Sequence, residues 1–193
     1  MVQQTWVVPT GTYAALTGRR DGLLLNVISV YVPPRLHAVT FPELSVLILQ
    51  LQLGILLIGG DFNLTVQADQ DRWLVRVGTP VRSPLADFLQ ALGLADIWRA
   101  RNQDVRQYTF HSGAHGSLSR IDYLLAPLDS IHLYTNIKHL ARGISDHSPL
   151  LTTITLQQSQ RRDTINPWYL MVQRCVKPST RPQSSIFQKT RVP

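Results

Sequence analysis

The chain of 193 residues contains one cysteine, Cys175, and one glutamate, Glu43. A single cysteine excludes an intramolecular disulfide framework and a zinc site of several cysteines, and we expect no disulfide-linked partner. The longest apolar run, residues 44–58, is interrupted by two glutamines and a glycine and is shorter than a membrane span requires. The first residues lack a basic segment followed by an apolar run, so no signal peptide is expected. These absences predict a protein in solution in a reducing compartment, with no membrane partner.

Positive charge is concentrated toward the C-terminal end. The formal net charge is +7, with 12 Lys and Arg against 11 Asp and Glu in residues 1–159 and 7 against 1 in residues 160–193. Because 44% of the residues are hydrophobic, we expect one globular domain over residues 1–157, followed by a basic tail over residues 158–193. The tail could attract nucleic acid through its charge, or it could be a solvated extension without a partner.

Apolar periodicity and turn residues predict alternating strands and helices, and hence an α/β fold. Strands are expected at residues 13–16, 23–31, 55–58, 108–111, 121–125, 131–141 and 150–156. One helix is expected at residues 41–53, with Pro42 in its first turn, and it should be well buried because it has apolar residues on nearly all faces. A second is expected at residues 83–93, capped by Ser83 and ended by Gly93. Residues 65–80 are predicted to form an exposed loop, and residues 95–98 a short connection or helical turn.

The strand at residues 55–58 leads into Gly59-Gly60-Asp61-Phe62-Asn63. On extended backbone, Asp61 and Asn63 point to one side while Phe62 points to the other, into the core. Paired polar side chains at the end of a buried strand suit a functional site on a rigid edge. The alternative is a glycine turn in which Asn63 satisfies local backbone groups.

Two other segments carry acids that could act chemically. Asp122 lies inside an apolar strand, where an unpaired charge is costly, so it needs a partner such as a histidine. Asp146 and His147 are adjacent in a turn just before the last strand. Taken alone, each of these features is more often structural than catalytic.

Five short motifs, taken together and in order, resemble the endonuclease/exonuclease/phosphatase superfamily. They are Tyr31 at a strand end, Gly-Asp-Phe-Asn at 60–63, Tyr-Thr-Phe at 108–110, Arg-Ile-Asp-Tyr at 120–123 and Ser-Asp-His at 145–147. The chain is most similar to the apurinic-type endonuclease domain of LINE-type (non-LTR) retrotransposons, over residues 11–156. The resemblance implies a four-layered α/β sandwich, in which two mostly antiparallel sheets pack together and helices flank them.

The resemblance also implies a hydrolase that nicks DNA with Mg²⁺, or with Mn²⁺ in its place. His147 would take a proton from the attacking water, and Asp122 would orient its ring. The other residues at matching positions are Asp61 at the water, Asn63 and Tyr31 at the phosphate, Asp146 at the metal, and Thr109 and Ser145 in support.

The chain departs from the family near its start. In the family, a strand with an asparagine and the glutamate that is the main metal ligand both precede the tyrosine motif, and residues 1–30 contain neither piece. Glu43 follows Tyr31, so its order does not fit the metal position. We therefore expect an N-terminally truncated domain in which metal binding is weak and activity is impaired.

Two alternatives remain open at this stage. The chain could be an inactive remnant that at most binds nucleic acid, or it could act on a phosphoinositide, a sphingolipid or RNA, because the fold does not fix the substrate. A DNA substrate implies action in the nucleus.

Overall fold

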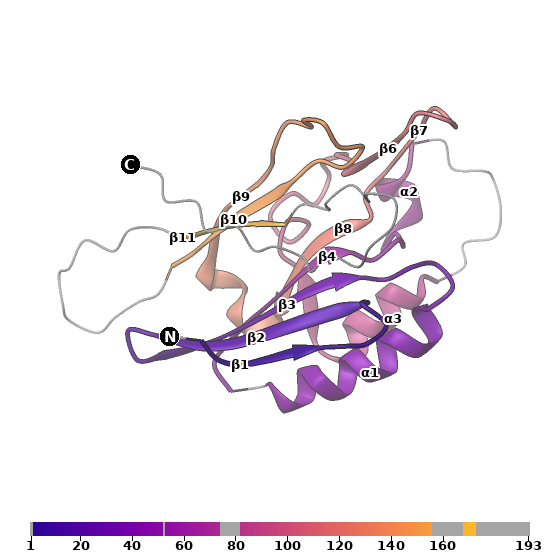
Figure 1. The fold of residues 1–193 in the computed structure, drawn as a ribbon. Coiled ribbons are helices and arrows are strands. Elements are labelled where there is room, and N and C mark those ends of the chain that lie inside the picture. Colours follow the sequence, from indigo (N-terminus) through magenta and orange to yellow (C-terminus); the bar gives the residue numbers. More distant parts are fainter. Residues whose placement is uncertain (1, 52, 74–81, 156–167, 173–193) are drawn as a thin grey trace.

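The computed structural model describes residues 2–51, 53–73, 82–155 and 168–172, the last of these by their backbone alone (Figure 1). Its largest element is a six-stranded sheet. The strands in spatial order are β1 (Val2–Val7), β2 (Tyr13–Arg20), β3 (Leu23–Tyr31), β4 (Ile55–Asp61), β8 (Asp122–Pro127) and β5 (Leu94–Asp96). β3 and β4 run parallel, and the other neighbours are antiparallel.

A smaller sheet and a hairpin complete the described strands. The smaller sheet has the order β11 (Trp168–Val172), β10 (Leu150–Ile154) and β9 (Tyr134–His139), and the hairpin pairs β6 (Phe110–Ser112) with β7 (Ser117–Ser119). The helices are α1 (His37–Gln50), α2 (Ala68–Asp71), α3 (Pro84–Ala91) and the 3-10 helix η1 (Leu128–Leu133). None of the described helices is both long and apolar enough to cross a membrane.

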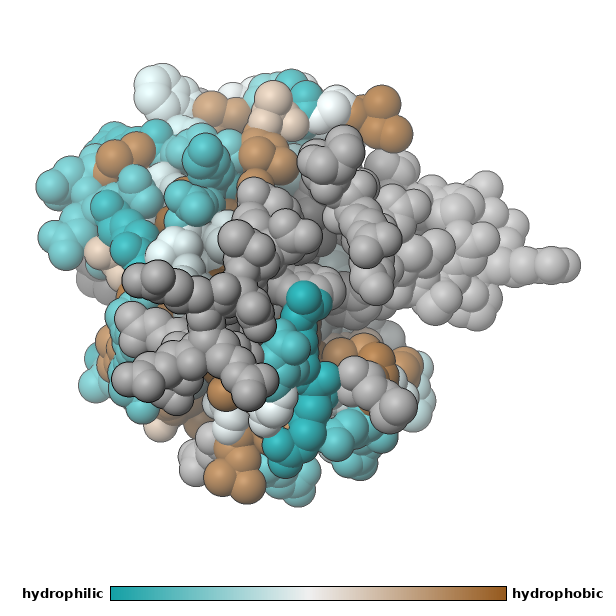
Figure 2. All heavy atoms as spheres, turned by 90° about the vertical axis from the view of Figure 1, so that its left-hand side faces the viewer, coloured by the Kyte–Doolittle hydropathy of each residue, from teal (hydrophilic) through white to brown (hydrophobic). Residues whose placement is uncertain are grey.

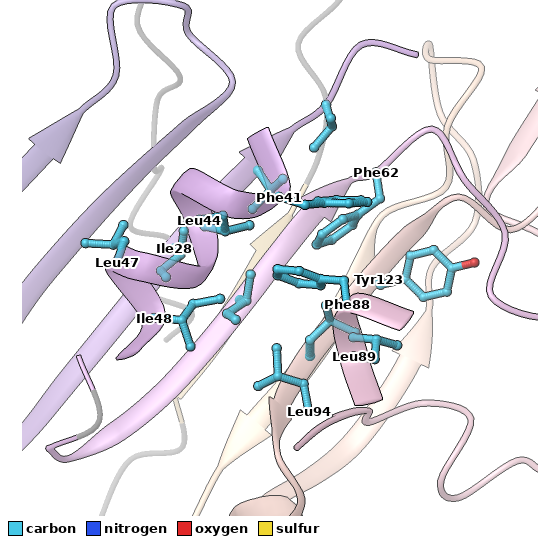
Figure 3. Close-up of a cluster of buried hydrophobic side chains, with 14 of the residues drawn as sticks. Ile28, Phe41, Leu44, Leu47, Ile48, Phe62, Phe88, Leu89, Leu94 and Tyr123 are labelled. Carbon is cyan, nitrogen blue, oxygen red and sulfur yellow. The ribbon is translucent and has the colours of Figure 1, made fainter. Parts of the chain in front are cut away.

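The large sheet has a separate apolar cluster on each face, because successive strand residues point to opposite sides. Ile58 and Leu125 belong to the cluster that contains Phe41 and Leu44 of α1 and Phe88 of α3. Figure 3 shows these three helix side chains directed into the cluster. On the other face, the cluster consists of Leu57, Leu124, Ala126, Ile97, Tyr134 and Leu150. In Figure 1, α1 and α3 lie along one side of the large sheet and β9–β11 lie toward the other. The expected α/β architecture of packed sheets and helices is confirmed.

Local signals set the boundaries of α3 as expected. The Leu85 N–H donates to Ser83 Oγ (3.3 Å), Pro84 is the first helical residue, and Gly93 follows the helix with φ +60°. These are the capping, entry and exit preferences of an isolated helix, so neighbouring residues alone are enough to define it.

Three expectations on secondary structure are wrong over part of their range. α1 begins at His37, so Pro42 lies inside the helix, and Val39, Val46 and Leu49 are exposed because only one side meets the sheet. Residues 95 and 96, expected in a short connection or helical turn over 95–98, belong to the edge strand β5, which pairs with β8, and the turn follows from residue 97. η1 occupies the first residues of the strand expected at 131–141, and β9 follows it.

β11 lies within residues 158–193, the segment that the sequence assigns to a basic tail. Its backbone pairs antiparallel with β10, from Leu150 opposite Val172 to Ile154 opposite Trp168. The rest of that segment, including Cys175, lies outside the described residues. On the face shown in Figure 2, hydrophilic residues are prominent among the coloured atoms and hydrophobic residues form small separate groups.

A buried ion network joins α2, β5 and the start of β8. Arg120, which is 1% exposed, donates from Nε to Asp71 Oδ1 (2.9 Å) and bonds Asp96 Oδ2 through a second guanidinium nitrogen. Arg99 donates to the same Asp71 oxygen (2.9 Å). Burial alone would lower the pKa of Arg120, but the neighbouring Asp96 and Asp71 outweigh it and raise this pKa. The exposed loop predicted for residues 65–80 is therefore wrong at Asp71, which is fully buried because it is neutralised by two arginines.

Replacing Arg120 by methionine would keep much of the side-chain volume and remove the charge between two buried carboxylates. We expect Arg120→Met to lower the free energy of unfolding by about 3–5 kcal/mol, the usual cost of leaving one side of a buried pair unpaired. Arg82→Met is the matched control, because Arg82 pairs with Asp87 at the surface and should change stability by less than about 1 kcal/mol. Urea denaturation of both variants measures this, and equal losses would contradict the assigned role of Arg120.

His139, the last residue of β9, packs its ring against Trp98 with a centroid distance of 4.7 Å. Burial, followed by the positive charge of Arg120, lowers the pKa of His139 to about 4. The unfolded chain therefore binds this proton at a higher pH than the folded chain. The contribution of His139 to stability is complete above pH 6.5 and is lost as the pH falls toward 4.

His139→Phe keeps an aromatic ring at Trp98 and removes the titration. The parent loses stability as the pH falls, and this variant lacks that loss. We therefore expect the unfolding free energy of the variant minus that of the parent to rise by about 1–3 kcal/mol from pH 7.5 to pH 4.5. Thermal or urea unfolding of both proteins across this range measures the difference. A stability difference that does not change with pH would refute the depressed pKa.

Candidate active site

Three of the predicted site residues form one row across adjacent strands. Tyr31 at the end of β3 is the register partner of Asp61 at the end of β4, and Asp61 is opposite Asp122 at the start of β8. Register partners on neighbouring strands direct their side chains to the same face. Leu57 and Leu124 are an even number of residues from Asp61 and Asp122 on the same strands, so all four side chains point to the same face. This is the face on which the smaller sheet packs. The row thus lies at one end of the inter-sheet core.

Gly60 is the residue that allows the ends of β3 and β4 to lie this close. Its φ is +150°, and a Cβ built on it would lie 1.9 Å from the Val30 carbonyl oxygen. Any side chain there would force the two strands apart. The next residue but one, Phe62, is fully buried and meets Tyr123 edge to face at 5.9 Å, as expected for a side chain that points into the core.

Asn63 lies beside Asp61, but not on the extended backbone that the sequence suggests. Its φ is +51°, and its backbone N–H donates to Asp61 Oδ1 (2.9 Å). Its side-chain nitrogen donates to the Val32 carbonyl (3.0 Å) and, at 3.2 Å, to Asp61 Oδ2. The extended backbone expected for Asn63 is wrong, because a left-handed turn lets it close hydrogen bonds on both oxygens of Asp61.

His147 reaches the row from the loop between β9 and β10. It is 2% exposed, and its Nδ1 donates to Asp122 Oδ2 over 2.8 Å. Nε2 is buried without a hydrogen-bond partner in the described part of the chain. The structure therefore supplies Asp122 with the histidine partner that its burial requires.

The electrostatics of this pair favour a basic imidazole. Burial lowers the pKa of His147, but the hydrogen bond to Asp122 and the negative charges of Asp122, Asp61 and Asp146 outweigh it, so the pKa is raised. An imidazole that is oriented by a carboxylate and has its second nitrogen unused is the arrangement of a general base.

The two predicted supporting residues hold the backbone around this pair. Thr109 Oγ1 accepts hydrogen bonds from the N–H groups of Ile121 and Asp122, each at 3.1 Å. Ser145 Oγ accepts from the His147 N–H at 3.1 Å. Both hydroxyls thus fix the local path of the chain at Asp122 and His147. This geometry is compatible with their predicted role, which concerns catalysis and stays a prediction.

A metal ion could be held at this centre. Asp61, Asp122 and His147 each offer a ligand atom, and these atoms lie within 4.8 Å of one another. Asp146, the predicted metal ligand, is exposed and lies outside this group, although its charge acts on His147. Glu43 is not part of this group and is exposed on α1. Partial burial of Tyr13 raises the pKa of that residue, and the charge of Glu43 adds to this effect.

The sequence interpretation missed the residues that surround this centre. The Asp71–Arg120–Asp96 network adjoins it directly, since Arg120 is two residues before Asp122 and its N–H donates to the Asp71 carbonyl (2.8 Å). The arginine inside the Arg-Ile-Asp-Tyr motif was a signal for this contact. The structure also shows an open pocket of about 420 Å³ lined by Arg106, Gln107, Tyr108, Thr109, Phe110, His111, Leu118, Arg142, Asp146 and Ser148.

Comparison with known sequences relates this chain to a transposon protein. No family model matches it. Over 128 residues, it is 32% identical to the "Transposon TX1 uncharacterized 149 kDa protein" of Xenopus laevis. The match covers 63% of this chain and 10% of that protein, so the chain spans about a tenth of its curated relative.

Solved structures similar to this chain include nucleases and a phosphatase. The AP endonuclease LMAP from Leishmania major superposes with a TM-score of 0.66 at 16% identity, covering 76% of this chain and 55% of that one. The endonuclease domain of TRAS1, a telomere-specific non-LTR retrotransposon, superposes with a TM-score of 0.61 at 17% identity, covering 80% of this chain and 70% of that one. The 3′ phosphatase NExo from Neisseria, bound to a product DNA hairpin, superposes with a TM-score of 0.62 at 20% identity, covering 81% of this chain and 72% of that one. The chain therefore has the fold of the endonuclease/exonuclease/phosphatase superfamily, and its sequence is similar to part of a transposon protein.

Proposed function

We propose that this chain is a metal-dependent endonuclease domain of a retrotransposon, which nicks DNA by hydrolysing a phosphodiester bond and acts in the nucleus. The observation that carries the proposal is the buried Asp122–His147 hydrogen bond opposite Asp61, with His147 Nε2 lacking a partner among the described residues. The similarity to the TX1 transposon protein and to the TRAS1 endonuclease domain supports the choice of substrate.

In this proposal, His147 Nε2 takes the proton from the attacking water. Asp122 keeps the ring oriented and stabilises the imidazolium that forms. Asp61, held by the N–H groups of Asn63, orients the water. The hydroxyl of Tyr31 donates to a phosphate or leaving oxygen at the end of the row.

Asn63 has a role here that differs from the one the family resemblance implies. Its amide nitrogen already donates to Val32 and Asp61, so a phosphate oxygen would have to replace the longer bond, 3.2 Å, to Asp61. We propose that Asn63 acts mainly by holding Asp61 and contacts the phosphate only through that exchange.

The carboxylates of this centre fit a hard divalent cation such as Mg²⁺ or Mn²⁺, which prefers oxygen ligands. Asp61 would hold it, and Asp146, which lies outside the group of ligand atoms, would add negative charge nearby. When bound, the ion would offset the negative charge that develops on the phosphoryl oxygens. Because Glu43 is not among the grouped ligand atoms, we propose that the metal is bound weakly and that the activity of this chain is reduced accordingly.

A second candidate function follows from that ligand set. A chain with too few carboxylates to hold the metal would be a nucleic-acid binder without catalysis. The experiment below separates the two, and the same assay with phosphomonoester or lipid headgroup substrates addresses the other superfamily activities.

The test is nicking of supercoiled plasmid DNA by the full chain. We expect nicking that requires millimolar Mg²⁺, because metal binding is weak, and that EDTA abolishes. His147→Ala, which removes the base, and Asp122→Asn, which removes the charge that orients it, should each lower the rate about 10²–10⁴-fold. Gel densitometry of nicked against supercoiled plasmid measures the rates.

His132→Ala is the matched control, because this histidine on η1 is exposed, its ring nitrogen bonds the Asp129 carbonyl, and its loss should not change nicking. Circular dichroism verifies that each variant is folded. Metal-dependent nicking that persists in His147→Ala would refute the role of His147, and no nicking by a folded parent would favour the non-catalytic candidate.

A further inference from the structure

The open pocket beside His147 is built by three separate segments. Arg106 to His111 form one wall, Leu118 of β7 contributes to it, and Arg142, Asp146 and Ser148 come from the loop between β9 and β10. The two walls are tied together by the Ser148 N–H, which donates to the Thr109 carbonyl (2.7 Å), and by the ring contact of Phe110 with His147 (4.9 Å). The pocket is therefore a fixed extension of the candidate active site.

Two arginines give this pocket its charge. Arg106 and Arg142 are exposed, and neither side chain has a hydrogen bond or ion pair within the described residues. Neighbouring arginines behave differently: Arg99 and Arg120 are bound to Asp71, and Arg101 donates to the Ile131 carbonyl. With Asp146 as its one acid, the lining carries two positive charges against one negative charge.

A pocket of this kind matches one chemical group. Guanidinium groups pair with phosphate oxygens, and unneutralised arginines at a surface are what phosphate binding in nucleic acids uses. Asp146 repels an anion, so a phosphate in this pocket would pair with Arg106 and Arg142 and not with Asp146.

We propose that Arg106 and Arg142 bind a backbone phosphate of the DNA strand next to the cleaved bond, and that the pocket between them is a substrate-binding subsite. The inference rests on the proposed function in taking DNA as the ligand. The subsite is independent of base identity, since it contacts phosphate, and it holds the strand so that the neighbouring phosphodiester lies at His147. The two arginines are positioning residues that increase affinity and take no part in bond cleavage.

The test measures binding without cleavage. Fluorescence anisotropy with a 20-base-pair duplex in EDTA gives Kd from 50 to 200 mM salt for the parent and for Arg106→Gln/Arg142→Gln. We expect Kd at 100 mM salt to rise at least about tenfold, and the slope of log K against log salt to fall by about 1–2. The matched control is Arg19→Gln/Arg20→Gln, which removes two charges near the opposite end of β3 from Tyr31 and should change Kd less than about twofold.

Equal weakening by both double variants would overturn the proposal, because it would show a general charge effect. A parent that does not bind the duplex at 50 mM salt would overturn it as well. Nicking in Mg²⁺ is recorded separately: arginine-dependent binding without any nicking would refute the proposed function and leave the subsite intact. Thermal unfolding midpoints equal to the parent's verify that the exposed substitutions leave the fold unchanged.

Discussion

The buried guanidinium of Arg120 between Asp71 and Asp96 is the interaction on which the candidate site depends most. A charge this deep is tolerated in only one arrangement of the chain, with α2, β5 and the start of β8 all in place. Because Asp122 follows two residues later, the network that neutralises Arg120 also determines where the first residue of β8 lies. A charged interior thus serves here to position a residue as well as to satisfy a pair.

The features that the sequence predicted well are those encoded by neighbouring residues. α3 follows from Ser83, Pro84 and Gly93, and β3 follows from a dense apolar run. The features it missed depend on distant partners. Asp71 looks like a loop residue until Arg120, 49 positions later, is brought against it. α1 was expected to be well buried because it is apolar on nearly all faces, but the sequence does not tell which of these faces the sheet covers.

The same distinction holds inside the site. Because burying an unpaired carboxylate is costly, the sequence predicted a partner such as a histidine for Asp122. The order of the motifs identified His147 as that histidine. The backbone of Asn63 was not predictable, because its left-handed turn is stabilised by contacts with Asp61 and Val32 that form only in the folded chain. Arg106 and Arg142 carried no local pattern, and only the folded loops bring them to one pocket.

The alignment of Tyr31, Asp61 and Asp122 in one row makes this centre intolerant of length changes within its strands. Inserting or deleting a single residue in β3, β4 or β8 would turn one of the three side chains toward the helices and bring an apolar neighbour into its place. Gly60 would lose its position against Val30 as well. Length variation in related chains should therefore be confined to the connections between these strands, while the strand segments leading to the row keep a constant spacing.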